Sequence, residues 1–166
     1  MKKILISVDG IKDSKEILPL FQDLRWRPEN IILLHVEQPV GAIPSEISGS
    51  AELSTLKESQ KCTDNKEKLE KAETILDYYK KELIKNGCKN IRTLIREGHQ
   101  SEKILKTAEE ENVDLIILNC SGKTRLQRLA SGCASKEVEE TAKMPVFITK
   151  GDGCGGHAHI WNKREA

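Results

Sequence analysis

The sequence predicts an α/β fold: a single-domain, open five-stranded parallel sheet with helices on both faces and an expected strand order of 3-2-1-4-5. Two observations lead to this prediction. Short apolar runs rich in Ile, Leu and Val alternate along the chain with segments of helical periodicity. Most of these runs are continuously apolar, which is typical of parallel strands that helices cover on both sides.

The strands are expected at five places. Continuous apolar runs occupy residues 4–8, 31–36, 115–118 and 146–148. A fifth run, residues 91–96, places Ile and Thr on one face and Arg and Leu on the other. This half-polar pattern predicts a strand at the edge of the sheet.

Two helices are expected before the third strand. Asp13 can cap the first, and Pro19 should kink it. The second helix has the clearest pattern, because its apolar residues step by three and four, and Gly87 is placed to end it. These apolar residues are Leu69, Ala72, Leu76, Tyr79 and Leu83.

The remaining helices follow glycines, and two stretches lie outside the pattern. A third helix is expected after Gly98 and a fourth after Gly132. Residues 38–66 contain several Pro, Gly and Ser and then a polar run, so we expect a long loop there. Residues 151–166 begin Gly-Asp-Gly-Cys-Gly-Gly and predict a flexible tail after a domain of residues 1–150.

The composition excludes several classes of protein. The 27 basic and 26 acidic residues leave a net charge of +1, so we expect no nucleic acid and no anionic membrane as a partner. No apolar run approaches the roughly 20 residues needed to cross a bilayer, and no signal peptide is recognisable. The five cysteines are odd in number and form no C-x-x-C pair, which favours a cytoplasmic location with reduced thiols.

A glycine-bracketed basic loop is the first candidate site. Ligands of open α/β sheets bind beyond the carboxyl ends of the strands. After the fourth strand, Gly122 and Gly132 enclose a segment with three basic residues, and Gly132 opens a helix. Glycines let a backbone approach a phosphate, and a helix start offers free N–H groups. Alternatively, the two glycines form a turn and a helix entry, and the basic side chains are solvated.

Several segments in a fixed order resemble the universal stress protein family over residues 1 to about 150. These segments are Lys-Ile-Leu-Ile-Ser-Val-Asp-Gly at 3–10, Leu-His-Val at 34–36, Gly-His-Gln-Ser-Glu-Lys-Ile-Leu at 98–105, Ala-Glu-Glu-Glu-Asn-Val-Asp-Leu-Ile-Ile-Leu at 108–118, and Met-Pro-Val-Phe-Ile-Thr-Lys at 144–150. The resemblance implies a regulatory or protective protein of the stress response that binds ATP, with magnesium, as its one cofactor.

Nucleotide-binding members of that family have the pattern Gly-x2-Gly-x9-Gly followed by Ser or Thr. Here Asn119 occupies the first glycine position and Cys133 the Ser/Thr position, while Gly122 and Gly132 keep theirs. The spacing is retained, but a thiol is a poor substitute for a hydroxyl that bonds a phosphate oxygen. The resemblance therefore implies weak binding of ATP.

The same resemblance assigns roles to individual residues. It places Asp9 and Val36 against the adenine and the ribose, and the segment after the fourth strand around the phosphates. The full set is Asp9, Val36, Asn119, Gly122, Gly132, Cys133 and Ala134. For Asp9 an alternative from the residues alone stays open, namely a carboxylate that caps a nearby turn.

The last strand is expected to form an intermolecular contact. Residues 146–149 are apolar and end the predicted sheet, so they should lie at an edge with unpaired backbone groups. Antiparallel pairing of two such edges across a two-fold axis would give a homodimer, as the family resemblance also implies. This suggests an alternative function, a dimeric interaction module of the same fold that binds no nucleotide.

Enzymatic activity beyond slow ATP hydrolysis is not expected. An ATP-splitting synthetase of the related fold needs Ser-Gly-Gly-x-Asp-Ser after the first strand, where residues 9–14 read Asp-Gly-Ile-Lys-Asp-Ser. A phosphoacceptor receiver needs an Asp after the third strand, where residues 96–98 read Arg-Glu-Gly. We therefore expect no catalytic residues.

The histidines and the remaining cysteines have simple interpretations. His35 lies inside a predicted strand and is expected to be a core residue with its polar atoms satisfied. Cys154, His157 and His159 form C-x-x-H-x-H, but a structural zinc site needs four ligands on an ordered frame. We therefore expect no metal there.

Overall fold

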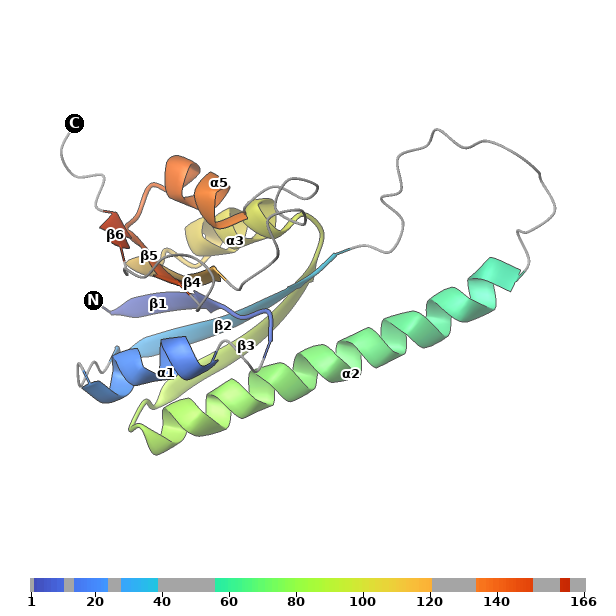
Figure 1. Ribbon diagram of the computed structural model, residues 1–166, viewed down its shortest axis with the longest axis horizontal. Helices are drawn as coiled ribbons and strands as arrows, with labels where there is room; N and C mark the ends of the chain where they lie inside the picture. Colours follow the sequence, from blue (N-terminus) through green and yellow to red (C-terminus); the bar gives the residue numbers. More distant parts are fainter. Residues whose placement is uncertain are drawn as a thin grey trace.

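The fold is a six-stranded sheet with helices on both faces (Figure 1). The computed structural model describes residues 2–10, 14–23, 28–38, 56–120, 134–150 and 159–161. The strands are β1 Lys3–Ser7, β2 Asn30–Glu37, β3 Asn90–Glu97, β4 Leu115–Cys120, β5 Val146–Lys150 and β6 His159–Trp161. The helices within these residues are α1 Ser14–Asp23, α2 Leu56–Lys85, α3 Gln100–Glu110 and α5 Ala134–Thr141.

The order of the parallel strands confirms the predicted topology. The sheet runs β3-β2-β1-β4-β5-β6, and the first five strands are parallel. β1 is central, with Ile6 in register with Leu33 of β2 and with Ile117 of β4. All three side chains are fully buried. β3 is an outer strand, as its half-polar pattern predicts.

Each face of the sheet has its own apolar core. On one face, α1 and α2 cover β1 and β2, where Ile4 and Ile31 pack with Tyr79 of α2. On the other face, α3 and α5 cover the sheet, where Leu5 packs with Ile104 and Val138. Burial on both faces explains why β1, β2 and β4 read as continuously apolar runs.

The second helix is much longer than its apolar stripe. α2 begins at Leu56, so the prediction of a loop throughout residues 38–66 is wrong for residues 56–66. Figure 1 shows the amino-terminal half of α2 projecting beyond the carboxyl ends of the strands. Because that half does not lie against the sheet, its sequence needs no apolar period, and the helical signal starts only at Leu69. Residues 39–55 lie outside the described residues.

The strand β5 is not at the sheet edge, which corrects the prediction made for residues 146–149. β6 pairs with it antiparallel, with Val146 opposite Trp161 and Ile148 opposite His159. Three residues of the segment predicted as a flexible tail therefore form a strand, and residues 151–158 and 162–166 lie outside the described residues. An isolated three-residue strand is too short to have a recognisable sequence period. The predicted homodimer rested on an edge that the chain's own segment covers.

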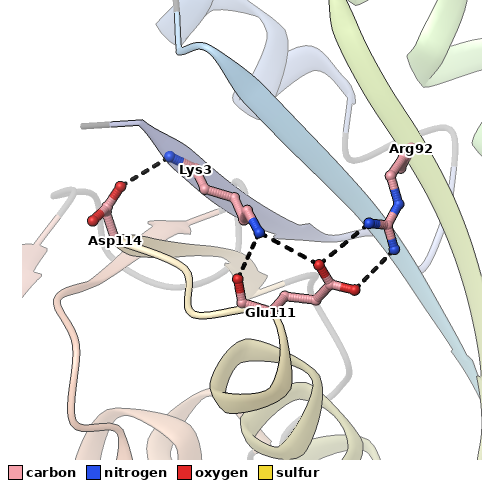
Figure 2. A network of polar contacts seen from close by, with 4 residues as sticks. All are labelled: Lys3, Arg92, Glu111 and Asp114. Atoms are coloured by element: carbon pink, nitrogen blue, oxygen red, sulfur yellow. Dashed lines mark hydrogen bonds and ion pairs between the residues drawn. The ribbon is translucent and has the colours of Figure 1, made fainter.

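A polar network joins the amino ends of β1 and β3 to the segment after α3 (Figure 2). It lies at the end of the sheet opposite the carboxyl ends of the strands. Glu111, which follows α3, accepts hydrogen bonds from both terminal nitrogens of Arg92, at 2.8 and 3.3 Å. The Nζ atom of Lys3 donates to the backbone carbonyl of Glu111 at 2.8 Å and lies 3.6 Å from its carboxylate. The carboxylate of Asp114 accepts the backbone N–H groups of Lys2 and Lys3 at 2.7 and 2.9 Å.

These contacts favour the charged form of the Glu111 and Asp114 side chains over the protonated form. Chiefly through its hydrogen bond, Arg92 lowers the pKa of Glu111 below the ordinary 4.5. The backbone N–H groups of Lys3 and then Lys2 lower the pKa of Asp114 below the ordinary 3.8. The unfolded chain therefore binds more protons than the folded one as the pH falls below these ordinary values. The resulting stabilisation is complete above them and is lost as the pH falls through the folded-state pKa values.

We expect Glu111→Gln to lower the free energy of unfolding at neutral pH by roughly 0.5–1 kcal/mol, because solvent screens a partly exposed ion pair. The same substitution should reduce the loss of stability on acidification. Urea unfolding at neutral and at acid pH measures both effects. Glu110→Gln, at the exposed neighbouring position, is the control and should leave the wild-type pH dependence unchanged. Equal pH dependence in all three proteins would contradict this account of the network.

We expect removal of residues 151–166 to increase self-association, because it exposes the outer backbone N–H and C=O groups of β5. Sedimentation velocity at tens of micromolar protein would show a larger dimer fraction in the truncated chain than in the full chain. A chain ending at Trp161 keeps β6 and is the matched control. If all three chains sediment alike, β6 does not protect this edge.

Candidate functional site

A pocket of about 380 Å³ lies at the carboxyl ends of β1 and β2. Asp9, two residues after the end of β1, lines it together with residues 35–38 at the end of β2. One wall comes from α2 through Lys68, Lys71 and Ile75, and Gln100 of α3 completes the lining. The pocket therefore lies at the carboxyl edge of the parallel strands, the edge at which open α/β sheets bind ligands.

The segment after β1, residues 8–10, is held by side chains from three other elements. The hydroxyl of Tyr79, on α2, donates to the carbonyl of Gly10 at 3.1 Å. The ring Nδ1 of His35, on β2, lies 2.7 Å from the carbonyl oxygen of Val8. The side-chain amide nitrogen of Gln100, on α3, lies 2.8 Å from both carboxylate oxygens of Asp9. Three consecutive residues, 8–10, are therefore each anchored to a different element.

His35 is a buried core residue with both ring nitrogens in contact with polar groups, as expected from the sequence. A carbonyl oxygen only accepts, so Nδ1 donates its proton to Val8. The second ring nitrogen, Nε2, lies 3.0 Å from Oε1 of Glu37. His35 thereby connects the segment after β1 to the end of β2.

The backbone before α3 determines where Gln100 lies. Gly98 has φ +139°, a conformation that L side chains rarely adopt, and its N–H donates to the carbonyl of Glu37 at 2.9 Å. A Cβ at this position would lie 2.4 Å from Cε of Lys103. The chain therefore turns sharply at Gly98, and α3 begins at Gln100 beside the pocket.

The pocket contains charges of both signs. Asp9 and Glu37 contribute carboxylates, and Lys68 and Lys71 contribute ammonium groups from α2. Within the part of the chain that the structure describes, neither lysine has an ion-pair partner. The two lysines can therefore pair with anionic groups of a ligand.

A second polar cluster joins α3 to α5 near the same end of the sheet. The buried hydroxyl of Ser101 donates to Oε2 of Glu137, and Nδ1 of His99 lies 2.9 Å from the Ser101 oxygen. Because the serine proton points to the carboxylate and the histidine donates to the serine, His99 is not the base that a nucleophilic serine needs. The cluster positions α5 rather than forming a catalytic triad.

The predicted site residues are only partly brought together. Asp9 and Val36 line the same pocket. Asn119, near the end of β4, accepts a hydrogen bond from the hydroxyl of Thr149 at 3.1 Å, and Ala134 is the first residue of α5. The other predicted site residues, Gly122, Gly132 and Cys133, lie outside the described residues.

Sequence reasoning missed Gln100, Tyr79 and the two lysines of α2. Lys68, Lys71 and Ile75 step by three and four, so their common helix face was recognisable. Gln100 follows Gly98 by two residues at the end of a predicted strand, which was also a usable signal. Tyr79 was recognised only as part of an apolar stripe, because sequence does not reveal the target of its hydroxyl.

Two kinds of feature are absent from the described residues, namely a metal-binding cluster and a membrane-spanning helix. These residues contain no group of three or more His, Cys, Asp or Glu side chains that could hold a metal ion, and Cys154, His157 and the side chain of His159 are not among them. None of their helices has the length and apolar character needed to cross a membrane.

The parallel sheet and the pocket beyond its carboxyl ends define an α/β protein of the class that binds small ligands at this edge. The sequence model of the Universal stress protein family matches residues 1–150. The chain belongs to the universal stress protein family.

Known proteins resemble the chain over most of its length. The universal stress protein MJ0577 of Methanocaldococcus jannaschii is 32% identical over 154 residues, which are 90% of this chain and 94% of that protein. The solved structure of MJ0577 covers 90% of this chain and 96% of its own, with a TM-score of 0.66 and 29% identity. The universal stress protein from Archaeoglobus fulgidus in complex with dAMP has the same fold, with a TM-score of 0.59, 16% identity, and 90% and 98% coverage.

We expect Tyr79→Phe to lower the free energy of unfolding by about 0.5–1.5 kcal/mol, because it removes the hydrogen bond to Gly10 and keeps the buried ring. Tyr78→Phe, at the neighbouring half-buried tyrosine, is the matched control and should stay within about 0.5 kcal/mol of wild type. Urea unfolding of the three proteins measures the difference. Equal losses in both variants would show that the Gly10 contact does not stabilise the fold.

Proposed function

We propose that this protein binds an adenine nucleotide, ATP in particular, in the pocket beside Asp9 and acts as a regulatory or protective protein of the stress response. The observation that supports this most strongly is the carboxylate of Asp9, held in place by Gln100 next to Val36. A fixed carboxylate accepts hydrogen bonds from an amino group, and Val36 and Ile75 offer apolar surface for the flat base.

The comparisons support the class of ligand. A family member of the same fold was solved with bound dAMP, an adenine nucleotide. The two lysines of α2 add positive charge to the pocket, which favours an anionic ligand over a neutral nucleoside.

The phosphates are proposed to lie toward β4 and α5. By the family pattern, the backbone N–H groups of the segment from Gly122 to Ala134 face the phosphates, with Mg²⁺ accompanying ATP. The N–H groups at the start of α5 give that end of the helix a partial positive charge. Asn119 and Cys133 depart from the family pattern, so binding is proposed to be weak.

The protein is proposed to act without rapid turnover and in the cytoplasm. Among the described residues, the one Ser–His–Glu cluster has a hydrogen-bond direction unsuited to nucleophilic catalysis. Any hydrolysis of bound ATP is proposed to be slow. The odd number of cysteines, without a C-x-x-C pair, supports a reducing compartment.

We expect Asp9→Ala to weaken ATP binding by about 10- to 100-fold, since a hydrogen bond to a charged group contributes about 1.5–3 kcal/mol. Isothermal titration calorimetry with ATP and Mg²⁺ measures the change. Asp77→Ala, at an exposed position of α2 outside the pocket, is the matched control and should bind as the wild type does. If the wild type gives no heat at millimolar ATP, the proposal is wrong, and the interaction module that binds no nucleotide takes its place.

We expect Gly132→Val to abolish ATP binding and Cys133→Ser to strengthen it. The branched side chain would block the approach of the backbone to the phosphates, and the hydroxyl would restore a hydrogen-bond donor. The same calorimetric titration, with circular dichroism to verify folding, compares both variants with the wild type. Wild-type affinity in a folded Gly132→Val protein would contradict the placement of the phosphates.

A further inference from the structure

We propose that Gln100 is a specificity-determining residue that acts by positioning Asp9, so that the pocket selects a base with an exocyclic amino group over one with a carbonyl at that position. This inference rests on the proposed nucleotide binding and deepens it. It concerns how the pocket distinguishes between purines.

The contact between the two side chains has a defined geometry. The amide nitrogen of Gln100 lies 2.8 Å from Oδ1 and 2.8 Å from Oδ2 of Asp9. A nitrogen equally distant from both oxygens lies near the bisector of the carboxylate and opposes its rotation. The amide oxygen cannot take this place, because it and the carboxylate are both acceptors. The orientation of both groups is therefore determined by their mutual contact.

The backbones on the two sides of this contact are also anchored. On the Asp9 side, the carbonyls of the flanking residues Val8 and Gly10 accept hydrogen bonds from other elements. On the Gln100 side, the N–H of Gly98 donates to β2, and Ser101 donates to α5. These bonds fix the backbone at both ends of the contact, and the direct contact between the two side chains then orients the Asp9 carboxylate before a ligand arrives.

An oriented carboxylate distinguishes an amino group from a carbonyl. Its remaining lone pairs can only accept, so the 6-amino group of adenine can donate to them. A carbonyl at the same position would place oxygen against charged oxygen, and the carboxylate would lose a hydrogen bond to water without replacement. A carboxylate free to rotate could turn away from that carbonyl. Discrimination therefore depends on Gln100 as well as on Asp9.

The other charged groups of the pocket do not supply this selectivity. Glu37 is engaged by His35, and Lys68 and Lys71 can donate to a carbonyl, which would favour the wrong base. All three groups are unchanged when only Gln100 is substituted. A change in the ratio of affinities then reports on the orientation of Asp9.

The test compares ATP with inosine triphosphate, which has a carbonyl and a ring N–H in place of the amino group and ring nitrogen of adenine. Isothermal titration calorimetry gives both dissociation constants for the wild type and for Gln100→Met, which matches the side-chain length but lacks the amide. We expect the wild type to prefer ATP by about tenfold or more, and Gln100→Met to reduce this preference to about threefold or less. The matched control is Gln22→Met, at an exposed position of α1 outside the pocket, which should keep the wild-type preference for ATP.

A second variant keeps the test informative if Gln100→Met is unstable. Asp9→Asn presents an amide that can donate to a carbonyl, so it should bring the two affinities together or reverse their order. If Gln100 has a purely structural role, Gln100→Met should weaken the binding of both nucleotides by the same factor and leave the ratio of their affinities unchanged. That result would overturn this inference but not the proposed function. A wild type that binds neither nucleotide overturns the proposed function and this inference with it.

Discussion

The anchoring of the three-residue segment from Val8 to Gly10 is the constraint on which the site depends. Each of its residues is bonded to a different element: β2 through His35, α2 through Tyr79, and α3 through Gln100. These bonds form only if β2 lies parallel beside β1, if α2 covers one face of the sheet, and if α3 starts at the carboxyl end of β3. The position of the Asp9 carboxylate is therefore a consequence of the whole layered arrangement rather than of a local motif.

The two ends of the sheet differ in how their charges are satisfied. At the amino ends, Arg92 and Lys3 are paired with Glu111, and the contacts join β1 and β3 to the end of α3. At the carboxyl ends, Lys68 and Lys71 line the pocket without an ion-pair partner in the described part of the chain. Charges at one end hold the fold together, and charges at the other are available to a ligand. This difference agrees with binding at the carboxyl edge of a parallel sheet.

More of the fold than of the site could be predicted from the sequence. Continuous apolar runs such as Ile31 to Val36 identify strands buried on both faces, and the alternation at residues 91–96 identified the edge strand β3. β6 was missed because three residues have no measurable period, and its pairing with β5 is a long-range contact. Asp9 and Val36 were named from family resemblance and do line one pocket. Gln100 was not named, because its contact with Asp9 joins residues 91 positions apart.

The central claim is that the anchored segment after β1 helps to form a ready-made pocket for an adenine base, and nuclear magnetic resonance tests it most directly. Two-dimensional ¹H–¹⁵N spectra of the labelled protein would be recorded while ATP is added. The account predicts that, on the sheet and α3, the largest shifts occur at the backbone amides of Asp9 and Val36 and at the side-chain amide of Gln100. Shifts concentrated instead around Lys89 and Arg92, in the pocket at the amino ends of the strands, would contradict it.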